Sequence, residues 1–204
     1  MEHRTKRTAI EITFTLNGVD RRVEIAPGET LFHLLRRLGI ASVKFGSEDG
    51  SAGYGTVLRD GRLCSSVVTL AAQIDGAEIE TVEGLGEPRR KGWGRDPDLD
   101  PLQRAFIETG AIQSGYDAPA LILAGRALLR RNPNPTEAEV RDAISGIVSR
   151  ETGHAKPVVA ILRAAAVLRG ETPPPLDTVP RSASSGPLRS VVGKPLPKVD
   201  APKL

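Results

Sequence analysis

The sequence predicts an α+β protein in which strands around one helix precede four helices and an extended tail. Apolar and polar side chains alternate over residues 10–16, the period of a half-buried strand. After a segment rich in glycine, proline and charge, the apolar period becomes helical, and prolines then recur without any period. These observations divide the chain into a first domain at 1–86, a linker at 87–98, a helical domain at 99–170 and a tail at 171–204.

The first domain begins with a hairpin. Asn17-Gly18, between residues 10–16 and 19–25, is typical of a type I′ turn that joins two antiparallel strands. Thr30 can cap a helix with a leucine-rich face, which ends at Gly39. A second hairpin and a late strand are expected to complete the domain, at 56–59 with a turn at Asp60-Gly61, and at 77–82.

The second domain is expected to contain four helices, because apolar residues recur there every three or four positions. In the first of them we expect Leu102, Phe106 and Ile107 to face inward. Thr136 to Glu139 is a capping box that opens the third. Short connections between the helices predict a compact four-helix bundle. The four helices are expected to begin at Asp100-Pro101, Asp117, Thr136 and residue 157.

Composition excludes several classes of function. The net charge of +3 comes from 28 basic and 25 acidic residues mixed along the chain, without the basic stripe of a nucleic-acid surface. No apolar run approaches the roughly 18 residues of a membrane span. The N-terminus has no apolar run behind it, so no secretory signal is expected. The single cysteine excludes an intramolecular disulfide and fits a cytoplasmic protein.

A glycine-rich loop at residues 43–57 is the strongest local signal. Four glycines stand within ten residues of it, at positions 46, 50, 53 and 55. Glycine lets the backbone come close to a ligand, which can be a phosphate, a metal cluster or another piece of protein. The Gly-Lys-Ser/Thr of a nucleotide P-loop is missing, so that alternative is excluded.

The loop and two segments of the second domain carry a family resemblance. Residues 46–56 resemble Gly-Cys-x-x-Gly-x-Cys-Gly-x-Cys-Thr, the cysteine spacing of plant-type ferredoxins. Residues 102–119 resemble a segment that ends Gln-Cys-Gly-Tyr-Cys-Thr-Pro, and 145–154 resemble Ser-Gly-Asn-Leu-Cys-Arg-Cys-Thr-Gly-Tyr. Over about residues 9–170 the chain thus resembles the iron–sulfur subunit of the xanthine oxidase/aldehyde oxidoreductase family of molybdenum hydroxylases. The resemblance implies a ferredoxin-like β-grasp in the first domain and the family's second 2Fe–2S domain in the helices.

The resemblance implies eight cluster-ligand positions, and none of them is a cysteine here. Cys64 lies out of frame, three residues before the fourth position. Serine is a poor substitute for a thiolate, and alanine, glycine and valine offer no donor. We therefore expect this chain to hold no 2Fe–2S cluster and no other cofactor. The positions are Ser47, Ala52, Gly55 and Val67 for the first cluster, and Ser114, Asp117, Ser149 and Glu151 for the second.

The second set of positions leaves one alternative open. Its two serines and two carboxylates could hold a hard cation such as magnesium or calcium. We prefer the interpretation in which Asp117 caps its helix and Glu151 pairs with Arg150 or another neighbour. His3, His33 and His154 are too scattered to form a site, and no catalytic residue is predicted.

The tail resembles another part of the same family. Its prolines alone predict an extended linker. Residues 192–203, however, resemble the opening of the family's molybdopterin-binding subunit. The resemblance implies that the chain descends from a fusion or forms the front part of one.

Three functions follow as hypotheses, and the first is preferred. The chain is a non-catalytic docking subunit of a xanthine oxidase-family complex that has lost 2Fe–2S electron transfer, and its partner does non-redox or repurposed chemistry. Alternatively it carries electrons through a cluster held by unusual ligands, or it is a stand-alone binding module. The resemblance implies a large molybdopterin-type subunit as partner, with a flavin-type subunit as a further candidate. Any molybdopterin or FAD would belong to those partners.

Overall fold

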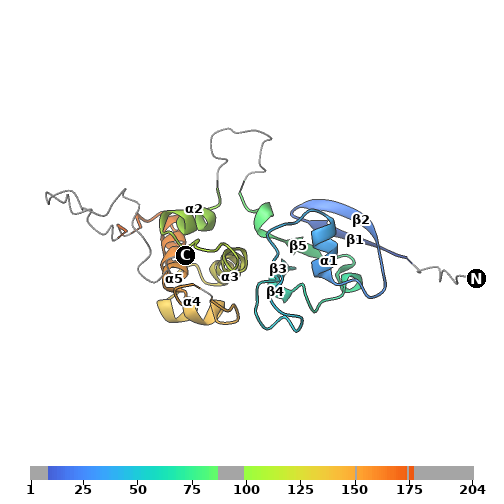
Figure 1. Cartoon of the computed structure of the whole chain (residues 1–204). Helices are drawn as coiled ribbons and strands as arrows, with labels where there is room; N and C mark the ends of the chain where they lie inside the picture. The colour runs from blue at the N-terminus through green and yellow to red at the C-terminus, as the bar shows by residue number, and fades with distance from the viewer. Residues whose placement is uncertain (1–8, 87–98, 150, 174, 177–204) are drawn as a thin grey trace, which may run out of the picture. The chain divides into compact units, whose positions relative to one another are not determined.

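The computed structural model describes residues 9–86, 99–149, 151–173 and 175–176. The chain divides into two compact units, Met1–Pro174 and Pro175–Leu204. The helices and strands of the described residues all lie in the first unit (Figure 1). The predicted linker at 87–98 and the tail beyond residue 176 lie outside the described residues.

A five-stranded mixed sheet and one helix form the N-terminal part of this unit. The strand order is β2-β1-β5-β3-β4, in which β1 and β5 run parallel and the other neighbours antiparallel. Helix α1 (Leu31–Arg37) buries three leucines in one core with the inner side chains of β1. The strands are β1 (Ile10–Leu16), β2 (Val19–Ile25), β3 (Thr56–Arg59), β4 (Arg62–Ser65) and β5 (Glu78–Glu80).

Both predicted hairpins are confirmed, and their turns have the expected chemistry. Asn17-Gly18 and Asp60-Gly61 each have positive φ at both positions, which a type I′ turn requires. The late strand, predicted at 77–82, is shorter than expected. The chain leaves the sheet at Thr81, whose N–H donates to Oδ1 of Asn17 at 2.8 Å, and Val82–Gly84 then forms a 3₁₀ turn.

Four helices follow in the described residues, close to the predicted starts. Thr136 and Glu139 form the expected capping box. Leu102 and Phe106 are buried as predicted, but the prediction for Ile107 is wrong, because its side chain is 57% exposed. Successive helical side chains point about 100° apart, so these two neighbours cannot both face the core centre. The helices are α2 (Pro101–Glu108), α3 (Ala118–Arg131), α4 (Glu137–Ile144) and α5 (Ala155–Leu168).

The core of the helical part crosses the predicted domain boundary. Tyr54, Leu58 and Leu85 belong to the same buried cluster as the inner faces of the helices. An ion-pair network adds to this contact, because both Nη atoms of Arg130 on α3 bind the Glu80 carboxylate on β5, at 2.6 and 2.8 Å. Burial is the largest single influence and raises the pKa of Glu80, but the hydrogen bonds and positive charges of Arg130 and Arg126 together outweigh it, so the pKa lies below its usual value. The two predicted domains therefore pack as one unit.

The α+β class is confirmed, with a mixed sheet followed by helices. A regular four-helix bundle stays a prediction, because α3 also packs on β3. Within the described ranges, no helix has both the length and the apolar character needed to cross a membrane.

Candidate functional site

The glycine-rich loop is closed by its own hydrogen bonds. Oγ of Ser47 accepts from the backbone N–H of Ala52 at 3.1 Å and lies 3.3 Å from Oγ of Ser51. Asp49 accepts from both N–H and Oγ–H of Ser51, and these bonds lower the pKa of its carboxyl to about 2. Ser47 is the only one of the first four positions with a polar side chain, and that side chain is already engaged.

The other two positions of the first set also meet. A Cβ added at Gly55 would lie 2.6 Å from Cγ2 of Val67, a side chain that is buried. Ser66, next to Val67, links the same two segments, because its Oγ–H donates to the Gly55 carbonyl at 2.6 Å. Cys64, the one sulfur donor, lies half-buried with Sγ 3.2 Å from Oγ1 of Thr69. The structure thus joins the first set in two pairs, Ser47 with Ala52 and Gly55 with Val67.

Three of the second set are joined by hydrogen bonds. Oε1 of Glu151 accepts from the backbone N–H of Ser114 at 2.5 Å, and the N–H of Glu151 donates to Oγ of Ser149 at 3.3 Å. Gln113 and Thr152 add a bond of 3.0 Å between the same two loops. The predicted partner Arg150 lies outside the described residues. Among the described residues, the carboxylate of Glu151 therefore binds the backbone N–H of Ser114.

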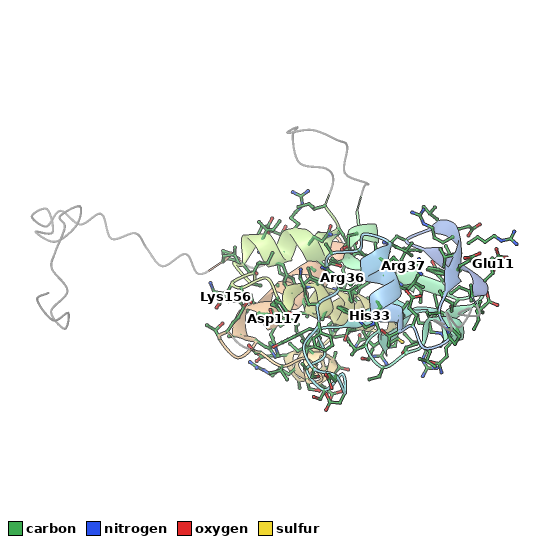
Figure 2. The ribbon with its side chains drawn as sticks, turned by 45° about the vertical axis from the view of Figure 1, so that its right-hand side comes forward. Glu11, His33, Arg36, Arg37, Asp117 and Lys156 are labelled. Carbon is green, nitrogen blue, oxygen red and sulfur yellow. The ribbon has the colours of Figure 1, made fainter. Side chains whose placement is uncertain are left out.

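Asp117 differs from the prediction made for it. It stands before α3, but its side chain makes no cap hydrogen bond, and its buried Oδ1 has no partner within the described part of the chain. Burial, and then the charge of Glu151, raise the pKa of its carboxyl, while the charge of His154 lowers it. Figure 2 shows Asp117 at the start of α3 and His33 on α1, while His3 lies outside the described residues.

Replacing Asp117 with asparagine tests this burial. A raised carboxyl pKa means that its contribution to stability is complete below the unfolded-state pKa and is lost as the pH rises through the folded-state pKa. Asp117→Asn is therefore expected to be more stable than the wild type near about pH 8, and the difference should vanish near about pH 3.5. Urea unfolding at both pH values measures it. The control is Asp142→Asn, at an exposed position on α4. The prediction is contradicted if the stability of the Asp117 variant changes with pH no more than that of the control.

The glycine-rich loop packs directly against the two loops that carry the second set of positions, at residues 109–117 and 145–154. The N–H of Val148 donates to the Ala52 carbonyl at 3.1 Å, and Oη–H of Tyr116 donates to the Phe45 carbonyl at 2.5 Å. A Cβ at Gly53 would lie only 2.3 Å from the carbonyl oxygen of Gly146. Of the three ligands that the glycine pattern allowed, the structure shows another piece of protein at Gly53. Sequence reasoning missed this contact, because its two sides are far apart in the chain.

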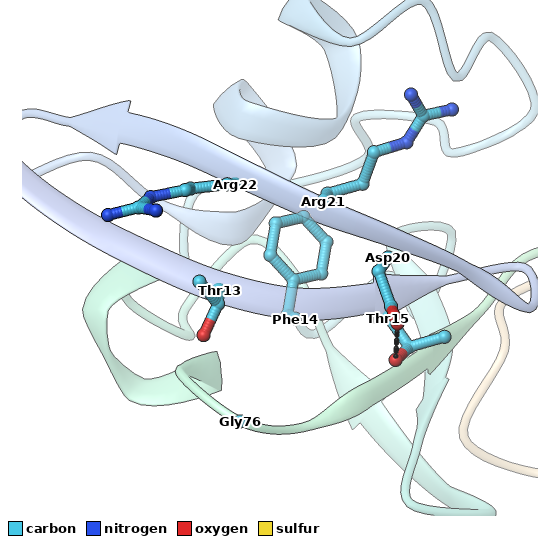
Figure 3. Close-up of a pocket in the computed structure, with 7 residues that line it drawn as sticks. All are labelled: Thr13, Phe14, Thr15, Asp20, Arg21, Arg22 and Gly76. Carbon is cyan, nitrogen blue, oxygen red and sulfur yellow. Dashed lines mark hydrogen bonds between the residues drawn. The ribbon is translucent and has the colours of Figure 1, made fainter.

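The described surface also has an open hollow of about 410 Å³, on β1 and β2. In Figure 3, the ring of Phe14 projects from β1, Thr15 donates a hydrogen bond to Asp20, and the side chains of Arg21 and Arg22 extend away from each other. Arg22 is engaged by Glu11 at 2.5 Å. Because the polar groups do not converge, this hollow has no assigned ligand. Among the described residues, no group of three or more His, Cys, Asp or Glu side chains could hold a metal ion. The cation hypothesis uses two serines and two carboxylates and stays a hypothesis.

Comparison with known proteins decides the family. Residues 81–162 match a family model described as a [2Fe-2S] binding domain. The nicotinate dehydrogenase small FeS subunit of Eubacterium barkeri is 40% identical over 148 residues, which cover 72% of this chain and 89% of the relative. The chain belongs to the family of iron–sulfur subunits of the molybdenum hydroxylases.

Two further matches extend over different lengths. The crystal structure of quinoline 2-oxidoreductase from Pseudomonas putida 86 contains a chain with a TM-score of 0.71 and 36% identity, covering 80% of this chain and 99% of that one. The probable hypoxanthine oxidase XdhD of Escherichia coli is 33% identical over 195 residues, which are 95% of this chain but only 19% of that protein. The chain therefore has relatives of two kinds: separate small subunits, and much longer chains of which it matches only one part.

These matches overturn the prediction that the chain has no cofactor. A model described as a [2Fe-2S] binding domain and a relative named as an FeS subunit indicate a 2Fe–2S cofactor. The prediction was wrong because it considered only the side chains at the eight ligand positions, whereas the family match extends over most of the helical domain. The side chains at these positions nevertheless do not fit ligation by four thiolates, since they are oxygen donors or aliphatic groups.

Proposed function

We propose that this chain is a docking subunit of a molybdenum hydroxylase-type complex and that it binds a large molybdopterin-type subunit in the cytoplasm. The contact between the glycine-rich loop and the loops that carry the second set of positions supports this function. Backbone bonds such as Val148 to Ala52 hold both loops in one fixed shape, and a preformed surface loses little entropy when a partner binds. The relatives named as small subunits support the same role. A flavin-type subunit is proposed as a second partner.

The second candidate is electron transfer through a 2Fe–2S cluster with unusual ligands. The family match favours it, and so does the buried Oδ1 of Asp117, which has no hydrogen-bond partner among the described residues and lies within the electrostatic influence of Glu151. The hypothesis that the partner's chemistry is non-redox is supported only by the missing thiols. Iron content therefore separates the two candidates.

We further propose that the tail at 171–204 belongs to the docking function. The alignment with XdhD includes 195 of the 204 residues, so it must include most of the 34 tail residues. The tail therefore has a counterpart within the longer relative. In this chain such a segment would bind along a separate large subunit.

Purification of the tagged full-length chain from its native host tests these proposals. The large molybdopterin-type subunit, identified by peptide sequencing, should co-purify in stoichiometric amount, and iron, molybdenum and visible absorption are then measured. A chain that elutes alone contradicts docking. Iron near two or more atoms per chain with visible absorption favours the electron-transfer candidate. A chain ending at residue 176 should bind the large subunit at least about tenfold more weakly, and equal binding rejects the role of the tail.

A further inference from the structure

Asn17 is the one asparagine of these 204 residues that is followed by a residue other than proline. Spontaneous deamidation begins when the backbone nitrogen of the next residue attacks the side-chain carbon Cγ of asparagine. Asn132 and Asn134 precede prolines, whose nitrogens carry no hydrogen and cannot complete that attack. Gly18, by contrast, has an N–H and no side chain to hinder the approach. Asn17 is therefore the asparagine that can react in this way.

In the folded protein, both ends of the Asn17 carboxamide are held by Thr81. Its Oδ1 accepts from the Thr81 N–H at 2.8 Å, and its Nδ2–H donates to Oγ1 of Thr81 at 2.9 Å. The Thr81 side chain is completely buried, and its own Oγ1–H donates to Oε2 of Glu83 at 2.7 Å. Because that proton is already used, Oγ1 offers its lone pairs to Asn17. The orientation of the carboxamide is thus fixed.

Gly84 packs against the same carboxamide. A Cβ added at Gly84 would lie 2.4 Å from Oδ1 of Asn17 and 2.5 Å from its Cγ, so this close approach requires glycine. Attack by the Gly18 nitrogen requires the carboxamide to turn its face toward that nitrogen, which breaks both hydrogen bonds to Thr81. Leaving these buried groups unpaired costs free energy, and that cost adds to the barrier of the reaction.

We propose that Asn17 is the deamidation site of this chain and that its contacts with Thr81 and Gly84 keep it unreacted in the folded protein. In the reaction, a bond forms between the Gly18 nitrogen and Cγ of Asn17. The Cγ–Nδ2 bond breaks, and Nδ2 leaves as ammonia with the proton of the Gly18 N–H. Water then opens the cyclic imide and gives aspartate or isoaspartate. The sum is gain of water and loss of ammonia, so nothing is oxidised or reduced.

The product would weaken the place where the sheet meets the helices. A carboxylate at position 17 has no proton to donate to Oγ1 of Thr81, whose own proton is held by the carboxylate of Glu83. Two acceptors would then face each other. The same turn also binds α2, because Nε2–H of Gln103 donates to the Val82 carbonyl at 3.1 Å. Deamidation is therefore expected to loosen this junction.

Incubation of the purified full-length chain at mildly alkaline pH tests the proposal. Ammonia release and the mass of the peptide that contains residue 17 are followed over time. The folded wild type should react at least about tenfold more slowly than the chain unfolded in guanidinium chloride. Gly84→Ala places a Cβ on the carboxamide, and Thr81→Val removes the Oγ1 acceptor. Each should react at least about threefold faster than the wild type.

Gly28→Ala is the matched control, because a Cβ there would meet nothing within 4 Å, and its rate should equal that of the wild type. Circular dichroism checks that each variant is folded, and if one is not, the other decides. Equal rates in the folded and unfolded wild type overturn the protection. Wild-type rates in the folded variants overturn the role of Thr81 and Gly84, and ammonia released from any other residue overturns the site. Asn17→Asp should unfold at a lower urea concentration than the wild type, and an unchanged midpoint overturns the weakened junction.

Discussion

Replacing Gly53 with alanine is expected to destabilise the fold by about 3–5 kcal/mol. Gly53 has a φ of +75°, a conformation that costs other residues about 1–2 kcal/mol. In addition, its new Cβ would lie 2.3 Å from the carbonyl oxygen of Gly146 and 2.9 Å from Cα of Ile147. Both are backbone atoms and cannot rotate away, so the two loops must separate. Urea unfolding of the purified chain measures the loss.

Gly76→Ala is the matched control for this substitution. Gly76 has the same φ of +75°, but a Cβ there would meet nothing within 4 Å. It should therefore show only the conformational cost of about 1–2 kcal/mol. The difference between the two variants isolates the contact between the loops. Equal losses would show that the loops can move apart freely, against the rigid contact described above.

Replacing Phe106 with alanine should cost about 3–5 kcal/mol. Its ring is completely buried in the helical core, so the substitution removes apolar contacts and leaves a cavity. Ile107→Ala, one residue along the same helix but 57% exposed, should cost less than about 0.5 kcal/mol. Denaturant unfolding of the two variants gives the comparison. Similar losses would mean that Ile107 is buried, as the periodicity alone predicted.

The Phe106 variant should also unfold in a single transition. Tyr54, Leu58 and Leu85 of the N-terminal part belong to the same buried cluster as Phe106. Loss of the ring therefore weakens contacts on both sides of the predicted domain boundary. Fluorescence and circular dichroism should give coincident transitions. Two separate transitions would contradict a shared core and favour independent domains.

Much of the local structure could be predicted from neighbouring residues. The positive φ angles at Asn17-Gly18 and Asp60-Gly61, and the capping box from Thr136 to Glu139, confirm turn and cap chemistry that acts over one to three residues. The prediction for Ile107 failed because the sequence shows that a helix is amphipathic but leaves the edge of its buried face uncertain. The family resemblance was confirmed because its motifs extend over much of the chain. The cofactor prediction failed because it considered only the side chains at eight positions, whereas the family match depends on the whole domain.

The sequence by itself determined the α+β class, the hairpins, the helix starts and the family, because short-range turns, caps, periods and motifs encode each of them. Only the tertiary structure decided that Gly53 packs against Gly146 and that Tyr54 enters the helical core. It also decided that Asp117 is buried with an oxygen that has no partner among the described residues. These features depend on segments that meet only when the chain closes on itself. Burial and close contact are properties of that packing, and no local pattern in the sequence records them.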